Sequence, residues 1–306
     1  MKRADLILAV GMALLGPAGA WGGDLGGADI GASWSRLGAE ARSAGMAGAM
    51  VSVDGGLASL GYNSAGLAGL DRPHATLGYL AWVEGTSLQT LSVGMPLGPG
   101  VGAVSLDYFN AGTVDRVQAP LPGGVPQVQG SADLFFLRVG ADYAQALGPL
   151  QVGGGLRFLE QSLEGNSGLG VVFDLGLRVL TPLPGLSAGL AFQGLGPQIQ
   201  GASLPGELRL GAAYFIPAAM GVLLSADYST LRRDSSAGTL DLGAEVSVHP
   251  RLDLRAGFRT GSLNTATGLT AGAGFHFEAL TLNYAFQGIG ALGASHLLSL
   301  DWAFTP

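Results

Sequence analysis

The chain has 306 residues, a formal net charge of −7, no cysteine and a charged fraction of 12%, which is about half the usual value for a soluble globular protein. The lack of cysteine excludes disulfide frameworks, thiol nucleophiles and Cys-ligated metals. Lys2 is the only lysine, so the composition disfavours a nucleic-acid partner, and the small number of charges points toward a membrane.

Residues 1–20 have the features of a secretory signal peptide. A basic start precedes an apolar core, and Ala18-Gly19-Ala20 resembles a signal-peptidase site. A short buried helix is the alternative. Cleavage would remove Lys2, Arg3 and Asp5, which together carry +1, and would leave a mature chain with a net charge of −8. Beyond residue 20 no run of about 18 apolar residues predicts a transmembrane helix.

Residues 21–72 consist largely of small side chains, and between Ala39 and Leu70 the only aromatic residue is Tyr62. We expect this segment to be a plug inside a barrel, because glycine, alanine and serine can thread between bulky inward side chains. Alanine favours a short helix over 37–50, although each glycine there costs up to ~1 kcal/mol. Asn63 is a good N-cap for one helical turn from Ser64. An unstructured linker is the alternative.

From residue 73 to residue 306 the sequence predicts fourteen β-strands. Turn signals such as "EGT" at 84–86 and "GPG" at 98–100 separate them. The mean spacing of about 17 residues accommodates the 9–11 residues or so of a tilted membrane strand, and an even number is the rule in bacterial barrels. The expected strands begin near residues 74, 86, 100, 130, 148, 167, 184, 206, 219, 236, 250, 266, 278 and 294.

Polar and apolar residues alternate in these segments, as in "RLDLRAGFR" (251–259) and "TLDLGAEVSV" (239–248). This period of two is typical of strands. A soluble β-sandwich is the alternative, but its surface needs about 25–35% charged residues. We therefore predict an all-β fold, a transmembrane antiparallel β-barrel of about 14 strands over 73–306 with the N-terminal plug inside the lumen. In each strand we expect the apolar set of alternate residues to face lipid and the polar set to face the lumen.

Charges of both signs share the inward parity. Mixed signs favour cross-strand ion pairs that fill the interior, whereas a ring of one sign selects ions; a structural lattice is the preferred reading and a substrate filter the alternative. The predicted lumen charges are Asp107, Arg138, Asp142, Arg157, Asp174, Arg178, Glu207, Arg209, Asp227, Asp241, Glu245, Arg251, Asp253, Arg255, Arg259 and Asp301.

The longest predicted insertion is "TVDRVQAPLPGGVPQVQG" at 113–130, with three prolines and three glycines. Long loops of such barrels usually lie on the extracellular side, so it is either a contact loop or a tip without a partner.

Motifs for catalysis are absent. No HExxH occurs, the four histidines are scattered, and a Walker loop lacks its lysine. The one GxSxG match, "GLSAG" at 185–189, lies in a predicted strand and not at the strand-to-helix turn of a nucleophile elbow. We expect no enzyme activity, no metal and no cofactor.

The small-residue segment carries a family resemblance. The run 41–49 (ARSAGMAGA), then Asp54, then 63–67 (NSAGL) resembles the N-terminal signature of the PorV/PorQ family, which belongs with the FadL-like outer-membrane barrels. The sequence departs from that pattern at Ala47, Gly55 and Ser64, where the family has glycine, a second acid and proline. The residues that carry the resemblance are Arg42, Gly45, Met46, Gly48, Asp54, Asn63, Gly66 and Leu67.

The resemblance implies two functions for an outer-membrane protein of a Gram-negative-type bacterium. A PorV-like protein supports protein secretion and hands cargo proteins to a surface complex. A FadL-like protein is a plugged channel for small hydrophobic molecules. The charged lumen favours the first over a wide apolar conduit, and a structural barrel without transport is a third possibility. The expected partners are membrane lipid, secretion components or cargo, and hydrophobic small molecules, without nucleic acid.

Overall fold

A computed structural model describes residues 33–118, 127–163, 166–197, 199, 204, 206–217, 220–231, 234–260 and 268–304. The predicted signal peptide and residues 21–32 of the predicted plug lie outside these ranges. None of the helices in this part of the chain has the length and apolar character of a membrane-crossing helix.

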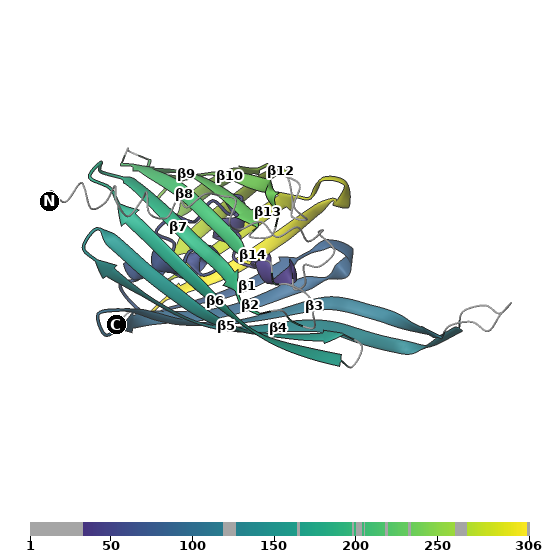
Figure 1. Ribbon diagram of the computed structural model, residues 1–306. Coiled ribbons are helices and arrows are strands. Elements are labelled where there is room, and N and C mark those ends of the chain that lie inside the picture. Colours follow the sequence, from purple (N-terminus) through teal and green to yellow (C-terminus); the bar gives the residue numbers. More distant parts are fainter. Residues whose placement is uncertain are drawn as a thin grey trace.

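Fourteen antiparallel strands close into one barrel in chain order, with β1 paired to both β2 and β14 (Figure 1). The predicted antiparallel β-barrel of 14 strands is confirmed, and every strand begins within three residues of its predicted start. The first seven strands are β1 (His74–Ala81), β2 (Ser87–Leu97), β3 (Gly100–Gln118), β4 (Gln127–Leu147), β5 (Leu150–Leu163), β6 (Asn166–Leu180) and β7 (Leu186–Leu195). The others are β8 (Glu207–Ile216), β9 (Val222–Leu231), β10 (Asp234–His249), β11 (Leu252–Arg259), β12 (Gly268–Phe277), β13 (Leu280–Gly288) and β14 (Ala294–Ala303).

The two ends of the barrel differ. At one end, here called the short-turn end, the connections 98–99, 148–149, 181–185, 217–221, 250–251 and 278–279 have two to five residues. Two of these turns are Gly-Pro pairs in which Gly98 and Gly148 have φ of 60° and 64°, the positive φ that a tight hairpin needs at its first central position. The opposite end is called the long-loop end.

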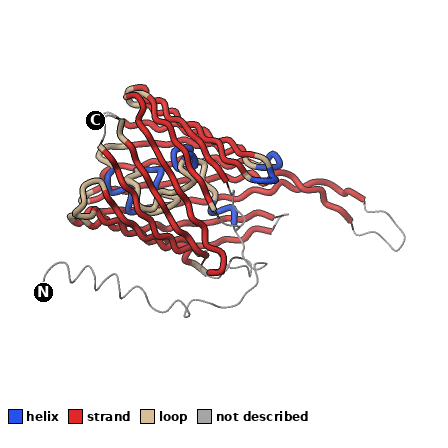
Figure 2. Tube along the Cα trace, turned by 90° about the horizontal axis from the view of Figure 1, so that it is seen from above, coloured by secondary structure: helices blue, strands red, loops and turns tan. Residues whose placement is uncertain are grey.

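Strands β3 and β4 extend far beyond the barrel as one hairpin (Figures 1 and 2). The predicted loop over 113–130 is therefore wrong in its bounds: pairing continues to Gln118 and resumes at Gln127, across two bulges. Alternating valine and polar residues sustain the strands on both sides of the proline-rich tip. Residues 119–126, which hold the tip, lie outside the described ranges.

The outer face of the barrel is apolar, as the alternation predicted. Large side chains that point outward remain exposed, among them Leu77, Leu175, Leu254, Leu300 and Trp302, which are 38–56% exposed. A surface of this kind is stable against lipid chains and unstable in water.

Candidate functional site

Residues 33–72, here called the inner segment, run through the lumen and are folded into short helical turns (Figure 2). These are η3 (Ser33–Arg36), α2 (Ala41–Gly45), η4 (Gly56–Ser59) and η5 (Ser64–Gly69). Two further turns, η6 (Val83–Gly85) and η7 (Gly290–Leu292), lie in connections at the long-loop end. Helix α2 packs on β11 to β14, and η5 packs on β3 to β6. The inner segment thus spans the lumen from wall to wall; that it blocks passage stays a prediction.

Helix α2 is shorter than the predicted helix over 37–50. The side chain of Glu40 caps it by accepting a hydrogen bond from the Ser43 amide at 2.9 Å. It ends at once because Ala47 and Gly48 adopt left-handed backbone with φ of 54° and 80°. Gly48 also lies where a Cβ would overlap the guanidinium of Arg259, so this glycine permits both the chain reversal and the close contact.

Asn63 holds the inner segment to itself and to the wall. Its Oδ1 accepts from the Ala65 amide at 3.0 Å, which is the cap expected from the sequence, and its Nδ2 donates to the carbonyls of Val51 and Leu177 at 2.7 and 2.9 Å. The neighbouring Ser64, at the family's proline position, donates from its hydroxyl to Asp142 at 2.7 Å. Serine here contributes a wall contact that proline lacks.

Glycines on the inner face of the barrel receive the backbone of the inner segment. A Cβ at any of these positions would come within 3.0 Å of an atom of the segment, and in most cases that atom belongs to its backbone, which has little freedom to move. These wall glycines are Gly78, Gly153, Gly176, Gly189, Gly243 and Gly257. Small residues therefore meet on both sides of the contact, which explains why the segment and the inward parity are both rich in glycine.

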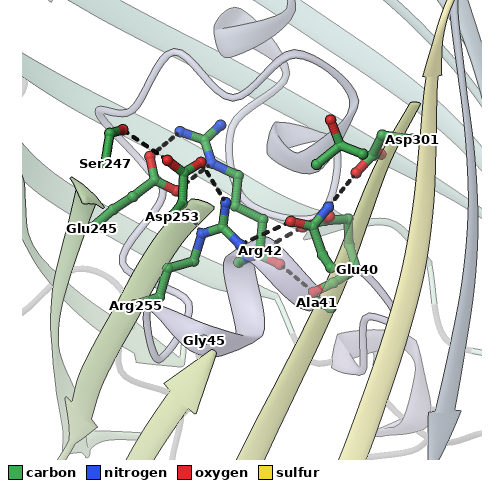
Figure 3. A network of polar contacts seen from close by, with 12 residues as sticks. Glu40, Ala41, Arg42, Gly45, Glu245, Ser247, Asp253, Arg255 and Asp301 are labelled. Carbon is green, nitrogen blue, oxygen red and sulfur yellow. Dashed lines mark hydrogen bonds and ion pairs between the residues drawn. The ribbon is translucent and has the colours of Figure 1, made fainter. Parts of the chain in front are cut away.

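Arg42 ties α2 to β10 (Figure 3). Its Nε and Nη2 donate to the two carboxylate oxygens of Glu245 at 2.9 and 2.8 Å, while Arg255 donates to the same carboxylate at 2.6 Å. Burial disfavours the charge on Arg42, but Glu245 outweighs that effect and raises the pKa of the Arg42 guanidinium above its ordinary value. The Arg42 guanidinium therefore stays charged beside Glu245.

The remaining signature residues are packing and hydrogen-bonding positions. Met46 and Leu67 are fully buried. Asp54 lies 3.6 Å from Arg178, and the carbonyl of Gly45 accepts from Thr270 at 2.9 Å. Gly66 leaves no room for a Cβ beside Ser59.

Most predicted lumen charges point inward and form ion pairs, either between neighbouring strands, within one strand or with the inner segment. The pairs are Arg138–Asp107, Arg157–Asp142, Arg157–Asp174, Arg36–Glu207, Arg209–Glu207, Arg255–Glu245, Arg255–Asp253 and Arg259–Asp241, at 2.5–3.4 Å. Asp227 accepts from the Val51 amide at 2.8 Å, and Arg178 donates to the Ser52 carbonyl at 2.7 Å. Asp301 accepts from Thr76 and Asn283. Asp227 and Arg178 thus contact the inner segment, whereas the two donors to Asp301 belong to β1 and β13.

Arg251 is the exception. It was predicted to point into the lumen, but it lies exposed in the turn before β11. The strand begins only at Leu252, and a register shift between Ser247 and His249 precedes it. Arg251 was assigned inward because it lies two residues before the inward Asp253, but the alternation of faces holds only within a strand and not across a turn.

An apolar inner surface at the long-loop end was missed by the sequence reasoning. Inward residues from β13 through β14 and β1 to β6 form it: Ala285, Leu297, Leu80, Leu88, Phe109, Phe136, Leu159 and Val172. The Trp34 ring stacks against Phe136 at 5.4 Å and Phe109 at 6.4 Å, with planes within 11°. The charges thus lie deeper in the barrel, and the lumen is not charged throughout.

A cavity of ≈110 Å³ lies beside this surface, between the inner segment and the wall. Its apolar lining includes Leu57, Leu60, Leu159, Val172 and Leu204, and paired charges complete it. An apolar cavity of ~150 Å³ holds one benzene molecule, so this cavity is on the scale of a very small hydrocarbon. No group of three or more histidine or acidic side chains is placed to hold a metal ion in the described ranges.

Comparisons with known proteins support the fold. No family model and no curated protein matches the chain. Among solved structures it is similar to the Pseudomonas putida toluene transporter TodX (TM-score 0.64, 14% identity, 88% of this chain and 99% of that chain). It is also similar to the monoaromatic hydrocarbon channel CymD (0.58, 14%, 88% and 98%) and to a Pseudomonas aeruginosa FadL homologue (0.56, 12%, 87% and 98%). The chain therefore has a FadL-like barrel fold.

Proposed function

We propose that the protein is a non-enzymatic outer-membrane channel that admits small hydrophobic molecules through a barrel closed by the inner segment. The observation that carries this proposal is the apolar inner surface around Trp34, Phe109 and Phe136, which leads to the ≈110 Å³ cavity. The apolar inner surface lies at the long-loop end, and in bacterial barrels the end with the longer loops is the extracellular one. The fold shared with hydrocarbon channels agrees with it.

The size of the cavity limits the substrate. A monoaromatic molecule slightly exceeds ≈110 Å³, given that ~150 Å³ accommodates benzene, so it enters when the side chains or the inner segment shift a little. A long acyl chain requires a much larger displacement. Short hydrocarbons and monoaromatic compounds are therefore the proposed substrate class.

Uptake into proteoliposomes tests the proposal. Radiolabelled toluene should enter faster with the protein than without it, and Phe136→Ala should alter uptake because Phe136 stacks on Trp34 inside the lumen. Phe135→Ala is the matched control, since Phe135 stacks on Tyr108 on the outer face. Equal toluene entry with and without protein would refute transport and leave a structural barrel.

Support of protein secretion is a second proposal. It rests on the PorV/PorQ-like signature and on the projecting hairpin, in which β2 pairing stops at Asn110 and β5 pairing starts at Phe135. Beyond these points the described strand pairing joins β3 and β4 to each other, and the edge of a sheet can accept an added strand. Deletion of 111–134 should reduce surface export of cargo proteins; unchanged export in that strain would remove this function.

A further inference from the structure

A second cavity lies on the other side of the inner segment. It measures ≈370 Å³ and lies at the short-turn end between residues 40–71 and the strands β1 and β10 to β14. The two cavities have four lining residues in common: Glu40, Leu57, Ala58 and Thr76. The two cavities therefore meet at these four residues, here called the junction.

At the junction the inner segment meets the wall through η4 and Ala39 instead of α2 or η5. The segment packs through α2 on β11 to β14 and through η5 on β3 to β6, whereas β1 and β2 are approached by η4 and by the Ala39 carbonyl at Gly78. The wall on this side carries small hydroxyl side chains. Those lining the first cavity are Thr76, Thr90, Ser92 and Ser105.

The second cavity is acidic. Six carboxylates line it, from Glu40, Asp54, Asp71, Glu245, Asp253 and Asp301, against the guanidinium groups of Arg42 and Arg255. Among the residues that the structure describes, Glu40 and Asp301 have no cationic nitrogen within 4.0 Å. Glu40 accepts from the Ser43 amide and the Ser299 hydroxyl, and Asp301 from Thr76 and Asn283. Excess carboxylates along a narrow polar path favour cations over anions.

We propose that the two cavities form a polar conduit for small monovalent cations and water along the inner faces of β1 to β3, with the Leu57 side chain as its constriction. This conduit shares the ≈110 Å³ cavity with the proposed hydrophobic path, but it follows the hydroxyl-lined wall of that cavity instead of the apolar surface around Trp34. It does not depend on whether hydrophobic molecules are transported. Leu57 is the one large apolar side chain of the four shared residues. The conduit is therefore narrow in the resting protein and widens when Leu57 is shortened.

Planar-bilayer recording of the full chain in a potassium chloride gradient tests this proposal. Leu57→Ala should raise the conductance severalfold. Leu60→Ala is the matched control, because Leu60 is buried to the same extent, 7% exposed, but lines the first cavity alone. An equal conductance of the two variants overturns the assignment of Leu57. Circular dichroism of both variants checks that the barrels are folded.

Ion selectivity provides the second arm. In Leu57→Ala the reversal potential should lie toward the potassium equilibrium potential, and adding Glu40→Gln should move it toward zero while the amide oxygen still caps α2. A reversal potential at zero or toward chloride in Leu57→Ala overturns the cation conduit. Toluene uptake is measured separately with the unsubstituted protein. Cation conduction without toluene uptake, or uptake without conduction, then shows which of the two proposals fails.

Discussion

Arg42 and Glu245 form a two-point ion pair that fastens the inner segment to the barrel wall. The two residues are 203 positions apart in the chain, and both nitrogen–oxygen distances are below 3.0 Å. Two parallel hydrogen bonds between a guanidinium and a carboxylate fix orientation as well as distance. The pair therefore sets where α2 lies in the lumen.

Arg42→Met should lower the thermal unfolding temperature of the barrel in detergent and raise its conductance. The loss corresponds to about 2 kcal/mol, the usual contribution of hydrogen bonds to charged groups. Arg72→Met serves as the control because Arg72 pairs with Asp71 at the exposed surface, where an ion pair contributes little. The temperature at which each variant loses its folded, heat-modifiable band on gels measures the unfolding of both variants. Equal unfolding temperatures for Arg42→Met and Arg72→Met would count against this anchor.

Asn63→Ala should destabilise the protein by more than the ~1 kcal/mol of a lost cap, because two further hydrogen bonds to Val51 and Leu177 are lost. Asn63→Asp separates these effects: it retains the capping oxygen but removes both amide donors. We expect no rescue by aspartate. A fully restored unfolding temperature in Asn63→Asp would mean that the cap alone matters.

Gly153→Ala should displace η5 from the wall and increase conductance, since the added methyl group overlaps the backbone at Ser64 and Ala65. Gly154→Ala is a neighbour with the opposite orientation, where the new Cβ finds ordinary contacts of 3.5 Å or more. Single-channel recordings should distinguish the two variants. Identical traces would show that the wall glycines do not seat the segment.

Arg255→Leu should destabilise the barrel more than Leu254→Ala. Arg255 is buried and contacts Glu245, Asp253 and Asn283; removing it leaves buried carboxylates short of a cation, which costs about 3–5 kcal/mol. Leu254 is 47% exposed on the outer face and loses only contact with lipid. Equal unfolding temperatures for the two variants would contradict their assigned faces.

The strands, and the face on which their charged residues lie, were predictable because side chains alternate between the two faces within each strand. This alternation begins anew after each turn. Arg251 shows the limit, since the period carries no information across a turn. The apolar inner surface was not predictable for a similar reason. In "RFLEQSL" of β5 both parities contain apolar residues, so Leu159 was indistinguishable from the outward Phe158, which is 52% exposed.

Contacts between segments that are distant in the chain could not be predicted from the sequence either. The composition of residues 39–70 indicated a narrow space, but nothing in it paired Arg42 with Glu245 or set Asn63 against Leu177. Those partners depend on barrel closure, which brings β6 and β10 around the same segment. The sequence did show that glycines occupy the same inward positions as the charged residues. It did not show the reason, which is that the backbone of the inner segment packs against these glycines.

The central claim is that the inner segment closes the lumen, and deletion of residues 37–70 tests it most directly. The strand pattern begins only at His74, so the shortened chain should still give a heat-modifiable barrel, and its planar-bilayer conductance should rise far above that of the full chain. A folded deletion variant that conducts no more than the intact protein would contradict the account.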